Sequence, residues 1–194
     1  MAQIIDDLPE SELRFHFLSG RPCLDLVATV GERWRRSFER LRSPADLGRW
    51  SVEAGLLGRP PRVSAADLAA ARGLREAICR VALDEGGSDD VEVINGWAER
   101  PDLPTRLAPD GRGLRAREEG TARRLLATVA RDAVDLFTGP HADRIRECAA
   151  DDCALIFVDT SRPGRRRWCS MRGCGNRAKT SAYRRRNADP KESR

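Results

Sequence analysis

Apolar side chains recur three or four positions apart along two long stretches of the first 140 residues, as they do on the buried face of a helix. In the first stretch these residues are Leu68, Ala71, Leu74, Ile78 and Ala82. In the second stretch they are Leu125, Leu126, Val129, Ala133 and Leu136. Ser64 is placed to cap the first helix, which we expect to end at Gly86-Gly87. The second helix is expected from about Thr121 to Phe137.

Shorter helices are predicted around these two. The pair Ser43-Pro44 combines an N-cap with proline at the first helical position, so a helix should run from there toward Leu57. The apolar residues 21–30 are expected to form a buried helix. A further helix is expected over residues 89–97, capped by one of the two aspartates at its start.

The β structure predicted for this part of the chain is small. Residues 14–20 are typical of a short strand that ends in a turn, and residues 105–117 of a hairpin turning at Asp110-Gly111. Gly139-Pro140 closes the last long helix. Residues 1–138 are therefore predicted to form a mostly helical domain with a small β element.

The charge changes where that domain ends. The chain has a net charge of +5, from 35 Lys and Arg against 30 Asp and Glu. Residues 1–140 carry 21 basic and 23 acidic residues, whereas residues 141–194 carry 14 basic and 7 acidic residues. A basic C-terminal segment of this kind suits an anionic partner such as nucleic acid.

The sequence offers no membrane or export signal. No apolar run approaches the roughly 20 residues of a membrane helix, and the N-terminus has acidic residues where a signal peptide has basic ones. We therefore expect a cytoplasmic protein with no membrane partner. In a reducing compartment, clustered cysteines are more often metal ligands than disulfides.

Four of the six cysteines lie in the last quarter of the chain as two pairs. Four residues separate Cys148 from Cys153 and also Cys169 from Cys174, and 15 residues lie between the pairs. Two close pairs on either side of a hairpin-sized insert supply the four thiolates of a tetrahedral zinc site. The sequence thus predicts one structural Zn²⁺ held by these four residues.

The segments around the cysteines predict how the site is built. Residues 155–159 are expected to form a strand, residues 165–168 a returning strand and residues 175–186 a helix. Cys174 then lies near the N-terminus of that helix, where the helix dipole favours a thiolate. The fold class is therefore mainly α with small β elements, with a treble-clef-like zinc module (β-hairpin and helix) over residues 139–194 that ends in a disordered tail.

Other interpretations of the four cysteines are ordinary burial, two disulfides or an iron–sulfur cluster. Cys23 and Cys79 stand alone in apolar helical segments and are predicted to serve packing. Four protein ligands leave zinc no open position for water, and the sequence has no phosphate-binding glycine motif. We therefore expect no enzymatic activity.

Two groups of residues resemble known families. Residues 166–171 (Arg-Arg-Trp-Cys-Ser-Met) and 174–177 (Cys-Gly-Asn-Arg) closely resemble the CGNR zinc finger, which is named for the second motif. Phe17-Leu-Ser-Gly and Cys23-Leu-Asp-Leu resemble the opening of the ABATE domain, which precedes this finger in bacterial stress-induced transcription regulators. That motif usually continues Asn-Thr, whereas this chain has Ala28-Thr29. The resemblance implies a regulator that binds DNA.

The basic module provides candidate contacts to nucleic acid, because arginine and lysine bind phosphate and amides bind base edges. These candidates are Arg165, Arg166, Arg167, Arg172, Asn176, Arg177, Lys179, Arg184, Arg185 and Arg186. Asn176 and Arg177 are open to a second interpretation, in which they brace the zinc loop. The alternative function is a zinc-stabilised adaptor whose basic face binds an acidic protein.

The N-terminal domain is expected to sense a ligand or to mediate association, including self-association. Arg21 and Asp25 are the candidate polar groups of a small-molecule pocket. The alternative is that they pair within the domain, as an aspartate on an apolar helix more often does.

Overall fold

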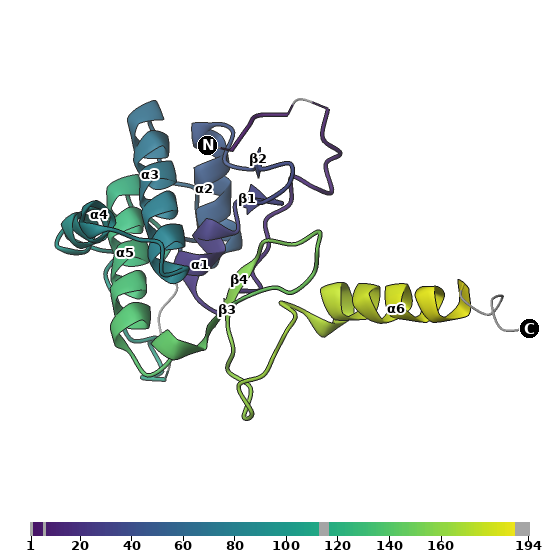
Figure 1. Ribbon diagram of the computed structural model, residues 1–194. Helices are drawn as coiled ribbons and strands as arrows, with labels where there is room; N and C mark the ends of the chain where they lie inside the picture. Colours follow the sequence, from purple (N-terminus) through teal and green to yellow (C-terminus); the bar gives the residue numbers. More distant parts are fainter. Residues whose placement is uncertain (1, 6, 113–116, 189–194) are drawn as a thin grey trace, which may run out of the picture.

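The computed structural model describes residues 2–5, 7–112 and 117–188, and its main body is a group of packed helices (Figure 1). The two longest helices, α3 (Ala65–Ala82) and α5 (Ala122–Thr138), pack against each other and against α4 (Ser88–Ala98). The apolar faces predicted for α3 and α5 are buried, apart from the half-buried Ala82. The helical periodicity in the sequence is confirmed.

Both long helices begin where they were predicted to begin, and each has a side-chain cap. The Ser64 hydroxyl accepts a hydrogen bond from the Asp67 backbone N–H at 3.1 Å, and the Asp67 carboxylate accepts one from the Ser64 N–H at 3.0 Å. The Thr121 hydroxyl accepts one from the Arg124 N–H at 3.3 Å. However, α3 ends before the predicted Gly86, because Asp84 has a left-handed backbone with φ 59°.

The other two predicted helices are shifted at one end. α2 (Pro44–Glu53) begins at the predicted proline and ends earlier than predicted, before Gly55, which has φ 69°. The N-cap of α4 is Gly87 and not an aspartate. Asp90 lies inside the first turn, and its carboxylate accepts a hydrogen bond from the Gly87 N–H at 3.2 Å.

A short central helix, α1 (Pro22–Val27), contacts α3 and α5 and is buried as predicted, but it is shorter than the predicted residues 21–30. It leads into a hairpin of β1 (Val30–Gly31) and β2 (Phe38–Glu39) that the sequence did not reveal. A Cβ at Gly31 would lie 2.1 Å from the Phe38 ring, so only glycine fits there.

One predicted β element is wrong, and the hairpin predicted at residues 105–117 is described only in part. Residues 14–20 form no strand, although the Ser19 carbonyl accepts a hydrogen bond from the Val158 N–H at 2.9 Å. Residues 105–117 include the predicted turn, with φ 71° at Gly111, but no strand in their described part. Residues 113–116 of that segment lie outside the described residues.

A second hairpin joins the helical body to the cysteine-rich part of the chain. β3 (Ile145–Glu147) pairs antiparallel with β4 (Ile156–Val158). Side chains alternate along β4, so that Ile156 and Val158 enter the main core while Phe157 packs with the cysteines. The strand predicted at residues 155–159 is confirmed, but its partner precedes it.

The returning strand predicted at residues 165–168 is wrong. This segment is held irregularly, because the Arg166 N–H donates to the Asp159 carboxylate at 2.8 Å and the Arg167 carbonyl accepts from the Ala149 N–H at 2.9 Å. These bonds replace a strand ladder.

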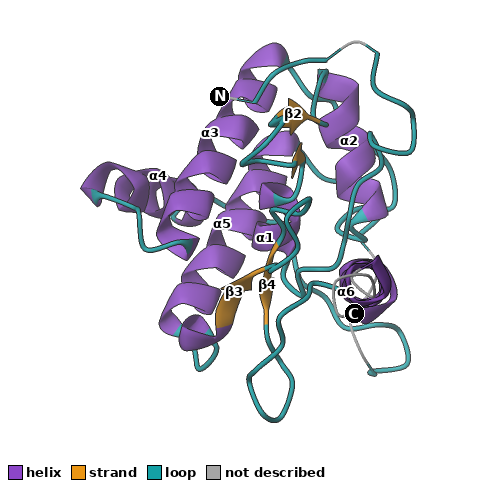
Figure 2. Cartoon of the chain, turned by 45° about the vertical axis from the view of Figure 1, so that its right-hand side comes forward, coloured by secondary structure: helices purple, strands orange, loops and turns teal. Residues whose placement is uncertain are grey.

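The last helix, α6 (Asn176–Ala188), follows a π-helical turn over Met171–Gly175 and extends away from the body (Figures 1 and 2). This confirms the helix predicted after Cys174. The tail predicted beyond it, residues 189–194, lies outside the described residues. Among the helices that the structure describes, none has both the length and the apolar character needed to cross a bilayer.

Candidate metal centre

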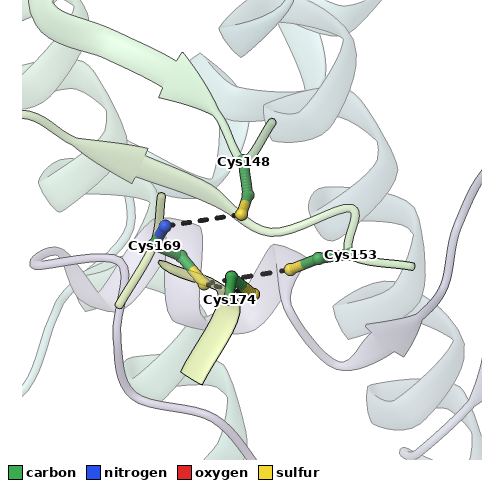
Figure 3. A group of neighbouring side chains, drawn as sticks. All are labelled: Cys148, Cys153, Cys169 and Cys174. Carbon is green, nitrogen blue, oxygen red and sulfur yellow. Dashed lines mark hydrogen bonds between the residues drawn. The ribbon is translucent and has the colours of Figure 1, made fainter. Parts of the chain in front are cut away.

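Four cysteine side chains from three segments converge beside the β3–β4 hairpin and the start of α6 (Figure 3). The sulfur atoms of Cys148, Cys153, Cys169 and Cys174 all lie within 4.8 Å of one another. Cys23 and Cys79 are buried in the main core, away from this group. The four cysteines that the sequence predicted as zinc ligands therefore form one cluster of four sulfur atoms.

The sulfur separations fit a single tetrahedral metal ion. The Cys169 Sγ lies 3.8 Å from the Cys153 Sγ and 3.5 Å from the Cys174 Sγ. Zn–S bonds of about 2.3 Å place tetrahedral thiolates about 3.8 Å apart. All four cysteines are free, and their sulfurs are too far apart for disulfide bonds. An iron–sulfur cluster has several atoms at its centre and holds its cysteine sulfurs further apart.

Local backbone bonds position each ligand. Cys148 directly follows β3, and its N–H donates to the Leu155 carbonyl at 2.9 Å. Cys153 ends a tight turn in which its N–H donates to the Ala150 carbonyl at 2.9 Å. The Cys169 N–H donates to the Cys148 Sγ at 3.4 Å, a contact that favours the thiolate. Hydrogen bonds of the backbone thus place these cysteines close together.

Tight packing beside Cys174 explains the glycine that follows it. A Cβ at Gly175 would lie 2.9 Å from the Met171 sulfur and 3.3 Å from the Trp168 ring. Trp168 packs against the cysteine cluster. Any larger residue at position 175 would force these two side chains away from the site.

The thiols of the cluster differ in their pKa values. A hydrogen bond with the Cys169 thiol lowers the pKa of Cys153 to about 6. Burial raises the pKa of Cys174 to about 12. Since a bound Zn²⁺ replaces these protons, metal retention falls as the pH is lowered. When bound, the ion supplies no reaction chemistry. It links the turn that carries Cys148 and Cys153 to the segments that carry Cys169 and Cys174.

Two of the predicted nucleic-acid contacts, Arg166 and Arg177, form hydrogen bonds to cysteines of the metal site. The Arg166 guanidinium donates to the carbonyls of Trp168 and Cys169 and lies 4.6 Å from the centre of the Phe157 ring. This arginine therefore makes contacts inside the module, and a phosphate contact for it stays a prediction.

Asn176 and Arg177 have the geometry of bracing residues. Arg177 donates to the Cys174 Sγ at 3.2 Å and to the Asp152 carboxylate at 3.0 Å. The Asn176 side-chain amide donates to the Arg172 carbonyl at 3.4 Å. Asp152 was missed from the sequence, although its position next to a ligand cysteine was a usable signal.

Five of the remaining basic candidates have exposed side chains. Exposed side chains are those of Arg165, Arg167, Arg172, Lys179 and Arg184. Arg185 and Arg186 lie within α6, but their side chains are outside the described part of the structure.

Arg21 and Asp25 are engaged within the helical body. Arg21 pairs with Asp132 at 2.8 Å and with Asp135 at 2.6 Å. The Asp25 carboxylate accepts hydrogen bonds from the Ser19 hydroxyl at 2.7 Å and from the Ser19 backbone N–H at 3.2 Å. These contacts match the alternative of internal pairing, and a ligand pocket at these residues stays a prediction.

A hairpin, a helix and one four-thiolate site define a zinc-finger protein. Two family models match the chain: residues 20–140 match ABATE, described as "Putative stress-induced transcription regulator", and residues 144–187 match the CGNR zinc finger. The chain belongs to the ABATE family and carries a CGNR zinc finger with one structural Zn²⁺. No match was found among curated proteins.

Proposed function

We propose that this protein binds duplex DNA through its zinc finger and regulates transcription, while the N-terminal region senses a ligand or mediates association. The observation that carries the proposal is a basic groove of about 890 Å³ along α6. It runs between that helix, residues 149–152 and residues 167–168.

Three arginines line this groove, and one of them, Arg167, also lies over the Trp168 ring at 5.1 Å from its centre. Arg167, Arg172 and Arg184 form no ion pair with a carboxylate in the described part of the chain. Hydroxyl groups of Thr180 and Ser181 lie along the same side of α6. Guanidinium and hydroxyl groups that are spread along a groove can follow a phosphate backbone.

The shape of α6 supports the same proposal. Among the elements of the structure it packs chiefly against the π-helical turn that precedes it, and it extends away from the body (Figure 1). Most of its described side chains are exposed, including Tyr183. A helix that is free on most sides can enter the major groove, while arginines at its base contact phosphates.

The family description agrees with a regulator. We also propose that residues 1–138 and 139–194 are separate functional parts, since the family matches divide near this point. We also propose that the N-terminal part binds a ligand or self-associates, and that the protein is cytoplasmic.

Salt-dependent binding tests the DNA proposal. We expect the zinc-loaded protein to bind random-sequence duplex DNA, with log K falling by about 0.9 per log unit of salt for each phosphate contact. Changing Arg167, Arg172 and Arg184 to Ala should make this slope shallower by about 2 to 3. The matched control changes Arg62, Arg123 and Arg124, exposed arginines of the helical body, and removes the same charge.

The outcomes distinguish the two functions. Equal loss of affinity in both triple variants would show a general charge effect and contradict the groove. If the wild-type protein binds no nucleic acid at any salt concentration, the adaptor that binds an acidic protein replaces this proposal. Arg177 is not included in the test because it contacts a zinc ligand.

A further inference from the structure

Arg40 is a buried cation where the helical body meets the zinc module. It follows β2, is only 6% exposed, and lies with its guanidinium 4.8 Å from the centre of the Phe38 ring. Its Nε donates to the Glu12 carbonyl at 2.8 Å and its Nη1 to the Ala28 carbonyl at 3.0 Å. Burial lowers the pKa of Arg40 to about 10. A charge buried in this way is costly unless an opposite charge compensates it.

Nearby carboxylates are committed to other arginines. Glu12 pairs with Arg36 at 2.5 Å, and Glu39 pairs with the buried Arg75 at 2.7 Å. Within the described ranges, Arg40 forms no ion pair with a carboxylate. The groups that favour its charged form are the carboxylates of Glu12, Glu32 and Glu39 and the sulfur of Cys153, one of the four zinc ligands.

The zinc ligands face the same space as Arg40. A cavity of about 450 Å³ between the body and the module is lined by Arg40 together with Cys153, Cys169 and Cys174. Ala28, whose carbonyl accepts the Arg40 hydrogen bond, packs in the same apolar cluster as three of the four cysteines. Arg40 and three of the four zinc ligands thus line one cavity.

The charges of the zinc centre call for such a partner. Four thiolates around Zn²⁺ carry a net charge of −2. Inside the module, Arg177 reaches a ligand sulfur but shares its charge with Asp152. The Arg166 guanidinium, which donates only to carbonyls, supplies one uncommitted positive charge. A second one is missing from the described part of the module's interior.

We propose that Arg40 is the counter-charge that the N-terminal region supplies to the zinc thiolate centre, and that it couples zinc retention to the packing of the two regions. Because coupling is reciprocal, zinc binding also stabilises the junction around Arg40. A change in the segment that carries Arg40 is then transmitted to the finger. This inference does not depend on DNA binding, and its test measures zinc and stability alone.

The first test compares zinc retention in full-length variants. Arg40→Met removes the charge and keeps the aliphatic stem, whereas Arg40→Lys keeps the charge. The control is Arg72→Met, which removes an arginine that donates to the Leu41 carbonyl at 2.6 Å in the same region. In competition with a chelator, we expect Arg40→Met to weaken zinc binding about tenfold or more, while Arg40→Lys and Arg72→Met stay within about threefold of wild type.

The second test separates charge compensation from a merely structural role. Arg40→Met is introduced into the wild-type chain and into Cys169→Ser, which lacks a complete zinc site. We expect a larger fall in Tm in the zinc-loaded chain than in the Cys169→Ser chain, since only the first holds the thiolate charge. If Arg40→Met does not fold, Arg40→Gln replaces it under the same criteria. Equal shifts in both backgrounds, or unchanged zinc affinity, would overturn the proposal.

Discussion

Arginine serves three purposes around the zinc site, and only its surroundings decide which. Arg166 is turned inward onto backbone carbonyls, Arg177 bridges a ligand cysteine and Asp152, and Arg184 lies exposed on the groove. In the sequence these residues belong to one basic cluster. Charge patterning alone does not distinguish a guanidinium that faces inward from one that faces outward. The four cysteines differ in this respect, since their spacing alone indicates their common role.

Asp159 gives a prediction at the scale of a single residue. It is fully buried, its carboxylate accepts hydrogen bonds from the backbone N–H groups of Ser161 and Arg166, and bonding to Ser161 and Arg166 lowers its pKa to about 2. Asp159→Asn places an amide against these donors. We expect the Tm to fall by roughly 5 °C, as measured by thermal unfolding at pH 7.

The direction of the Asp159 pKa shift determines how the loss of Tm in Asp159→Asn depends on pH. A carboxylate with a lowered pKa contributes fully above its ordinary pKa near 3.8, and the contribution is lost only as the pH falls toward 2. The difference between wild type and Asp159→Asn should therefore be constant from pH 7 to pH 5. The exposed Asp151→Asn is the control and should leave the Tm unchanged. A difference that shrinks in this range would contradict the assignment.

Among the elements, the long helices were predictable and the short strands were not. α3 and α5 each show an apolar face over several turns, and a local cap fixes where they begin. β3 and β4 have three residues each, so the choice of partner depends on tertiary contacts. The segment at residues 165–168 has strand-like chemistry, but Asp159 binds its backbone and prevents pairing.

β4 makes the finger and the helical body interdependent, which leads to a prediction for Cys169→Ser. With one ligand lost, we expect the zinc to be released and α6 to melt, while circular dichroism retains the helical signal of the body. The body should also lose about 2–5 kcal/mol of stability, because Ile156 and Val158 leave its core. Loss of the helical signal throughout would contradict a boundary near residue 138.

For the whole molecule, the sequence predicted the metal site better than its surroundings. The ligands are close in sequence, whereas Arg40 and the cavity at the junction arise only when distant segments pack together. No local pattern marks Arg40, since its importance lies in its burial beside the cavity that the zinc ligands also line. In our proposal, Arg40 couples the two family regions at this junction.

The zinc content of the purified full-length chain tests the central claim most directly. We expect one zinc per chain in the wild type and in the double variant Cys23→Ala, Cys79→Ala, because those two cysteines only pack in the core. Cys169→Ser should contain much less than one. A wild-type chain with no zinc or with two zinc ions, or a double variant that loses its zinc, would contradict the assignment of one four-cysteine site.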